Sequence, residues 1–192
     1  GRKMIVSTTD NGIRLRNLPS CEPIDMPDAE PLADSPVMAL AVSADGALFA
    51  TGNNEGVVQV WKAADGTLVR DMPKQDFLVG SLTFAAGAER LVASCGYRCG
   101  DKYRTVEWAV ADGKEALQYR GHDGTVYAST QSPDGRMVVT AGGLRHSIHL
   151  WDPQTGEDHR HGQRKLDSEQ ASGPAEAHRR RRGIDGGGHR TE

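Results

Sequence analysis

The chain has 192 residues, of which 26% are charged, and a formal net charge of −3 at neutral pH. No stretch approaches the roughly 18 consecutive apolar residues that span a bilayer, and the first residues lack the basic and apolar segments of a secretory signal. We therefore expect a cytoplasmic protein that forms one domain of ordinary size, with or without an extension, and has no membrane partner.

The cysteines are odd in number and widely separated, at Cys21, Cys95 and Cys99. This pattern argues against a disulfide framework and favours a reducing compartment. No second ligand pair at zinc spacing follows Cys95 and Cys99, so we expect a small strand residue and a loop thiol, with no metal and no cofactor. The first residue is Gly rather than Met, which is compatible with a fragment of a longer protein.

A sequence unit recurs at intervals of about 45 residues. Its copies in chain order are DNGIRLRNL (10–18), VVQVWKAADG (57–66), TVEWAVADG (105–113) and SIHLWDPQTG (147–156). In the last three copies a tryptophan is followed five residues later by a glycine: Trp61 and Gly66, Trp108 and Gly113, Trp151 and Gly156. The first copy has Arg16 in the place of the tryptophan.

The segments upstream of these tryptophans share one order of apolar strands and polar turns. Residues 37–61 and 126–151 align with a difference of one residue, and each contains a turn of the SADG or SPDG type. Asp and Gly tolerate such tight backbone, and short strands rich in β-branched residues between these turns indicate an antiparallel meander. Each unit is then a four-stranded sheet that must stack on its neighbours, and radial stacking of such sheets gives a propeller.

The last unit resembles the WD40 repeat family. Gly121-His122 matches the GH dipeptide, SPDG matches the hairpin between the first two strands, and Trp151-Asp152 matches the WD dipeptide. The resemblance implies an all-β fold, a WD40-type β-propeller segment of antiparallel four-stranded blades. It divides residues 1–157 into a partial blade and three blades, bounded at about 1–30, 31–72, 73–119 and 120–157.

The resemblance also implies a hydrogen-bonded set of His, Ser or Thr, Trp and Asp within each blade. Carried over by position, this structural set comprises His122, Thr140, Trp151, Thr51, Trp61, Ser94, Trp108 and Asp10. No unit has all four members, since Arg145 stands at the Asp position of the last unit. We interpret the tryptophans as packing residues whose indole N–H groups are satisfied locally. Glu107 occupies an apolar strand position.

The repeat pattern stops after Gly156, and residues 158–192 form a basic, glycine-rich tail. This tail offers only Leu166 and Ile184 as large apolar residues, so we expect it to be disordered. A reading-frame shift would produce the same loss of pattern. The run from His178 to Arg182 favours a solvated basic end over a nucleic-acid site, and His159 and His161 do not predict a metal site.

The sequence accounts for three fuller blades with partial ones at the ends. Closed propellers typically contain about four to eight blades. Exposed sheet faces would favour association. The chain is therefore interpreted either as a truncated or frame-shifted part of a longer propeller, or as an arc that self-associates through its open blade ends.

No catalytic motif is present, so we expect a chain that is not an enzyme and acts as a non-catalytic protein–protein interaction scaffold. A regulatory or sensor propeller segment of a multidomain signalling or protease-like enzyme is the alternative, and a propeller enzyme ranks behind both. The longest turn, SCGYRCGDKYRT (94–105), is rich in Tyr and Arg, which concentrate interface energy. The candidate protein-binding residues are Tyr97, Arg98, Lys102, Tyr103 and Arg104, with a solvated long turn as the alternative.

Overall fold

The computed structural model describes residues 2–7, 13–26, 35–97, 99, 103–132 and 134–159, with only the backbone described for 2–7. These residues form antiparallel strands and one short 3-10 turn, η1 (Ala86–Ala88), which confirms the predicted all-β class. Within the described ranges, no helix has the length and apolar character needed to cross a membrane.

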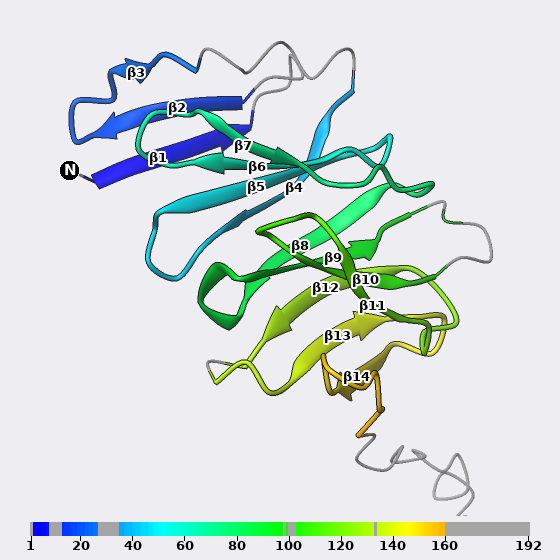
Figure 1. Ribbon diagram of the computed structural model, residues 1–192. Helices are drawn as coiled ribbons and strands as arrows, with labels where there is room; N and C mark the ends of the chain where they lie inside the picture. The colour runs from blue at the N-terminus through cyan, green and yellow to red at the C-terminus, as the bar shows by residue number, and fades with distance from the viewer. Residues whose placement is uncertain are drawn as a thin grey trace, which may run out of the picture. The chain divides into compact units, whose positions relative to one another are not determined.

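The strands pair into four antiparallel sheets, shown in chain order in Figure 1. The first contains β1 (Arg2–Ser7), β2 (Ile13–Leu18) and β3 (Pro23–Ile24). The second contains β4 (Val37–Val42), β5 (Leu48–Asn53), β6 (Val58–Lys62) and β7 (Leu68–Asp71). The third contains β8 (Val79–Ala85), β9 (Arg90–Cys95), β10 (Thr105–Ala109) and β11 (Glu115–Tyr119). The fourth contains β12 (Val126–Gln131), β13 (Val138–Gly142) and β14 (Ser147–Trp151).

The hairpins between the first two strands of the second and fourth sheets are built by the same polar contacts. In SADG the Ser43 hydroxyl donates to Asp45 Oδ1 at 2.6 Å, and the same oxygen accepts the Ala47 N–H. In SPDG the Ser132 hydroxyl donates to Asp134 Oδ1, also at 2.6 Å. Side chains that bond the backbone two residues on favour turns, which is why this motif separates the strands.

The glycine five residues after each tryptophan closes the next turn. Gly66, Gly113 and Gly156 have φ values of 73°, 72° and 73°, in the left-handed region that glycine adopts without a Cβ penalty. Their N–H groups donate to Lys62, Ala109 and Asp152 carbonyls at 2.9, 2.9 and 2.8 Å. The spacing seen in the sequence is therefore the length of this turn.

Each interface between successive sheets buries a hydrophobic cluster. Strand β8 lies beside both β4 and β12, so the first strands of these sheets are neighbours. Between the first and second sheets lie Ile13, Phe49, Trp61 and Ala63. Between the second and third lie Ala39, Ala41, Val58, Val60, Val79, Leu82, Leu91 and Trp108. Between the third and fourth lie Ala85, Val92, Tyr119, Val138 and Trp151.

Backbone pairing with β14 continues past residue 157, although the tail was predicted to begin at residue 158. Asp158 forms an isolated bridge with Trp151, and the His159 N–H donates to the Leu150 carbonyl at 2.7 Å. The Tyr119 hydroxyl also donates to Asp158 Oδ2 at 2.8 Å, which anchors this segment. Residues 160–192 lie outside the described residues, and with them the predicted disorder, His161 and the basic run from His178 to Arg182.

Candidate protein-interaction surface

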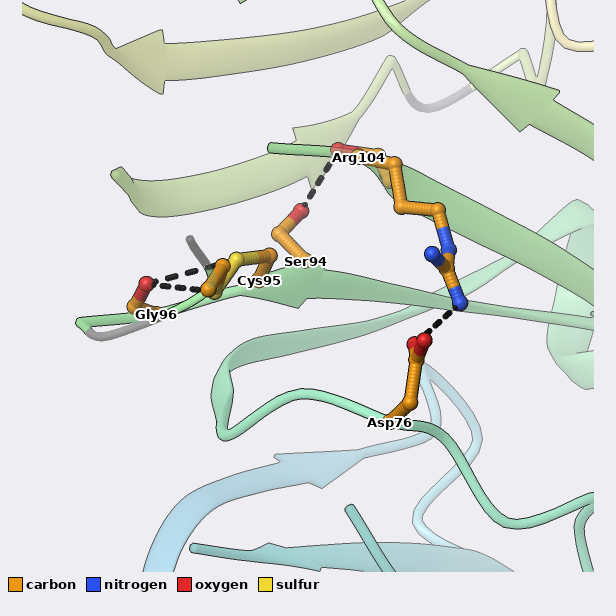
Figure 2. The surroundings of a disulfide bond; sticks show 7 residues. Asp76, Ser94, Cys95, Gly96 and Arg104 are labelled. Atoms are coloured by element: carbon orange, nitrogen blue, oxygen red, sulfur yellow. Dashed lines mark hydrogen bonds and ion pairs between the residues drawn. A yellow bond between two sulfur atoms is a disulfide. The ribbon is translucent and has the colours of Figure 1, made fainter. Parts of the chain in front are cut away.

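The turn between β9 and β10 carries the residues that the sequence nominated for partner binding. The structure joins Cys95 and Cys99 by a disulfide, shown in Figure 2, so the predicted loop thiol at position 99 is wrong. The turn doubles back and places their Cα atoms 6.2 Å apart, within the range that a disulfide bridges. Cys21 is a free, exposed cysteine.

Arg104 holds two turns together instead of facing a partner. Its guanidinium forms an ion pair with Asp76 at 2.6 Å, shown in Figure 2. It also lies 5.0 Å from the centroid of the Phe77 ring. Only 12% of the Arg104 side chain is exposed. Its carbonyl also accepts the Cys95 N–H at 3.0 Å. The nomination of Arg104 as a contact residue is therefore replaced by a structural role.

The two tyrosines of the turn differ in exposure. Tyr97 is 67% exposed, whereas Tyr103 is half-buried and packs against the core between the second and third sheets. Arg98 and Lys102 lie outside the described residues. Of the nominated residues that the structure describes, Tyr97 is the one that offers a large aromatic surface to solvent.

A hollow of about 280 Å³ adjoins this turn, lined by Asn54, Glu55, Asp76, Phe77 and Leu78. The Gly96 N–H donates to the Leu78 carbonyl at 2.8 Å, which fixes the residue before Tyr97 against the wall of the hollow. We call Tyr97 and these five lining residues the rim surface. It combines an exposed aromatic ring with carboxylates and apolar atoms, the mixture of groups found at protein interfaces.

The structure brings His122, Thr140 and Trp151 together. The Thr140 hydroxyl lies 2.8 Å from His122 Nε2 and accepts the indole N–H of Trp151 at 3.3 Å. Trp151 is fully buried and stacks on Tyr119 with ring centroids 4.8 Å apart. In the second sheet the Trp61 indole N–H likewise donates to the Thr51 hydroxyl, at 3.0 Å.

Ser94 and Trp108 do not meet. Leu91 pairs with Trp108 as Phe49 pairs with Trp61, so the residue equivalent to Thr51 is two positions past Leu91, at Ala93. Successive strand residues face opposite sides of a sheet, and Ser94 instead lies 3.0 Å from the Thr105 hydroxyl. The buried Trp108 Nε1 has no hydrogen-bond partner among the described residues. The prediction that this indole is satisfied locally is wrong.

At other positions of the structural set, a different residue makes the stabilising contact, and comparing the repeat units in the sequence did not reveal it. Asp10 lies outside the described residues, and Arg16, at the tryptophan position, donates to the Cys21 carbonyl at 2.7 Å. Arg145 forms an ion pair with Asp123 at 3.7 Å. Asp123 Oδ1 accepts the Leu144 N–H at 2.9 Å and so stabilises the turn where the family pattern expects an Asp.

His149 was not nominated by the sequence, although it lies at the centre of a polar network. Its Nε2 lies 2.9 Å from the Ser147 hydroxyl and its Nδ1 lies 2.7 Å from the Tyr119 hydroxyl. Its ring stacks on His122 with centroids 3.9 Å apart. These contacts join the third and fourth sheets through polar atoms, and we find no sequence signal that would have identified them.

Comparison with known proteins agrees with this architecture. The WD40 family model, described as WD domain, G-beta repeat, matches residues 31–62 and 113–152. These two stretches of the chain are therefore similar to WD40 repeats. Within the residues that the structure describes, no three His, Cys, Asp or Glu side chains gather in a way that could hold a metal ion.

Curated relatives of this chain are similar over part of their length. The WD repeat and SOCS box-containing protein 1 of Danio rerio is 32% identical over 108 residues, covering 56% of this chain and 25% of that protein. The human WD repeat-containing protein 43 is 36% identical over 69 residues, covering 36% of this chain and 10% of that protein. The chain thus spans a quarter or less of these relatives.

A solved structure shows the same fold. The computationally designed Ika8 protein superposes with a TM-score of 0.68 and 21% identity, over 83% of this chain and 46% of that chain. This likeness supports the propeller-type packing of the sheets and carries no information about partners.

Proposed function

We propose that this WD40 chain is a non-catalytic protein-interaction scaffold and that the rim surface is its contact site. The observation that carries the proposal is the exposed Tyr97 ring, which follows Gly96, whose N–H is bonded to Leu78 in the wall of a hollow that Phe77 and two carboxylates also line. The disulfide and the Arg104–Asp76 ion pair hold the surrounding backbone in place. A pre-organised aromatic residue binds at low entropic cost, which favours its use as an anchor.

Self-association is a further part of the proposal. Met38, Leu40 and Val42 are exposed on one face of β4. Contiguous apolar residues of this kind favour contact with another protein surface, including a second copy of the chain. The similarity covers no more than a quarter of the relatives' length. We therefore infer from them only that this chain contains WD repeats, and nothing about its partners. The cytoplasmic location stays a prediction.

Replacing Tyr97 by Ala is expected to weaken partner binding roughly thirtyfold, the effect of losing about 2 kcal/mol at an interface anchor. Tyr127→Ala is the matched control, because Tyr127 is also 67% exposed but lies on β12. Quantitative pull-down with the two variants and the parent chain measures the difference. A differently tagged copy of the chain included in the same assay separates self-association from binding of other proteins.

The proposal is contradicted if the proteins recovered with Tyr97→Ala and with the parent chain are the same in identity and amount. Loss of partners with Tyr127→Ala alone would move the contact site to the fourth sheet.

A further inference from the structure

Two histidine side chains stack face to face where the third and fourth sheets meet. His122 follows β11 and His149 lies on β14, and their ring centroids are 3.9 Å apart at an interplanar angle of 13°. Both side chains are buried, so solvent screens a charge on either ring only weakly. The proposed contact site on the rim surface uses neither residue.

The hydrogen bonds around His149 determine which of its nitrogens carries the proton when the ring is neutral. The Tyr119 hydroxyl donates its one proton to Asp158 Oδ2 at 2.8 Å, so it accepts from His149 Nδ1, which lies 2.7 Å away. Neutral His149 therefore has its proton on Nδ1 and accepts from the Ser147 hydroxyl at Nε2, over 2.9 Å. A further proton on Nε2 keeps this contact, because a hydroxyl oxygen accepts as well as donates.

His122 also has polar neighbours, but its carboxylate neighbour is already paired. Its Nε2 lies 2.8 Å from the Thr140 hydroxyl. A Cβ added to Gly143 would lie 3.5 Å from His122 Nδ1 and 2.6 Å from Asp123 Oδ1, so the imidazole and the carboxylate adjoin the same point. The negative charge of Asp123 is offset by Arg145, which forms an ion pair with it at 3.7 Å.

The charged side chains that the structure describes around the two rings balance one added proton and not two. Asp158 Oδ2 lies 3.8 Å from His149 Nδ1, and Asp123 is offset by Arg145. One protonated ring leaves this cluster neutral, whereas two protonated rings leave an unbalanced positive charge and place two like charges in one buried stack. The folded chain therefore accommodates one proton at this pair, while the unfolded chain binds two in acid.

We propose that the stacked pair of His122 and His149 is a pH-sensitive switch that releases the fourth sheet from the third in acid. The pair lies in the same interface as Tyr119 and Trp151, whose rings stack with centroids 4.8 Å apart. Repulsion between two protonated imidazoles therefore acts on the packing that joins these sheets. Release uncovers apolar surface on both sheets, including the buried Trp151 ring.

The direction of the pH dependence follows from the proton count. Imidazole ordinarily titrates near pH 6.5, and the closed form binds one proton fewer than the released form below that value. The closed form is therefore favoured above about pH 6.5 and loses stability as the pH falls. The population of the released form should rise by up to about tenfold for each pH unit below 6.5.

NMR of the imidazole rings in the full chain, between about pH 8 and pH 5, tests the proton count directly. The variants His122→Gln and His149→Gln assign the two ring signals, and the Trp151 indole N–H signal reports whether the sheets are still packed. We expect one ring of the parent chain to become protonated while the other stays neutral for as long as that packing persists. Full protonation of both rings near pH 6.5 in the packed chain would overturn the switch.

Hydrogen exchange of the Trp151 indole N–H, corrected for its intrinsic rate at each pH, measures release. Between about pH 7.5 and pH 5.5 its protection should fall about tenfold in the parent chain and less than about twofold in His149→Gln, which leaves one imidazole in the cluster. His159→Gln is the matched control, because His159 is an exposed histidine of the adjoining segment, and it should keep the pH dependence of the parent.

The ionisation of Glu107 falls in the same pH range, but it is common to all three chains and cancels in their comparison. Protection that does not change with pH in the parent chain would contradict the proposal. An equal fall in the parent chain and in His149→Gln would contradict it as well, because release would then not depend on the second imidazole.

Discussion

Replacing Trp151 by Ala is expected to lower the free energy of unfolding by about 3–5 kcal/mol. Trp151 is fully buried, stacks on Tyr119 and donates to the Thr140 hydroxyl, so the substitution opens a cavity between the third and fourth sheets and removes a hydrogen bond. Urea unfolding at equilibrium, monitored by circular dichroism, measures the change.

Leu144→Ala is the control for Trp151→Ala, because Leu144 lies in the same sheet's turn but is 76% exposed. Its effect should stay within about 0.5 kcal/mol. A loss below about 1 kcal/mol for Trp151→Ala would mean that the fourth sheet does not pack on the third through this ring.

Raising the pH from about 4.5 to 7 is expected to reduce the contribution of Glu107 to stability by about 3 kcal/mol. Burial raises the pKa of this carboxyl from 4.5 to about 7, so the folded state binds its proton more tightly than the unfolded state does. The contribution is fully present below the unfolded pKa and is lost as the pH rises through the folded one. The loss is complete about one pH unit above the folded pKa of about 7.

The variant Glu107→Gln isolates this effect, because it removes the titrating group and keeps the side-chain volume. Hydrogen bonds from Ser43 and Ser132 lower the pKa values of Asp45 and Asp134. These two carboxylates therefore lose their stabilising contributions only as the solution becomes more acidic. The difference in unfolding free energy between the parent chain and Glu107→Gln should therefore change with pH between about 4.5 and 7. A constant difference over that range would show that burial does not raise the pKa of Glu107.

The sheets were predictable because their signals are local. In SADG and SPDG the Ser hydroxyl donates to the Asp carboxylate, which accepts the backbone N–H two residues on. The glycine five residues after each tryptophan takes a left-handed φ. Such contacts depend on a few adjacent residues, so a repeated motif is enough to reveal them.

The errors arose where a contact depends on register or on distant residues. Ser94 was aligned by its distance from the tryptophan, but the pairing of Leu91 with Trp108 puts Ala93 at that position. The disulfide at Cys95 and Cys99 depends on how one turn folds back. The His149 network joins Tyr119, Ser147 and Asp158 across two sheets, which no local pattern records.

The candidate contact site was only partly predictable for the same reason. The composition of the turn correctly placed an exposed aromatic at Tyr97, because a long polar turn lies at the surface. It could not show that Arg104 is held by Asp76 and Phe77, since those residues belong to a different turn. The hollow near this turn likewise combines residues from separate segments of the chain.

A photo-cross-linking phenylalanine derivative placed at position 97, with the same residue at position 127 for comparison, tests the proposed contact site most directly. Both positions carry equally exposed tyrosines in the parent chain, so the reactive group has similar access to solvent in each variant. We expect cross-links to partner proteins from position 97 and few or none from position 127. Cross-links from position 127 alone, or from neither position while partners are still captured, would contradict the rim surface as the place where this chain binds.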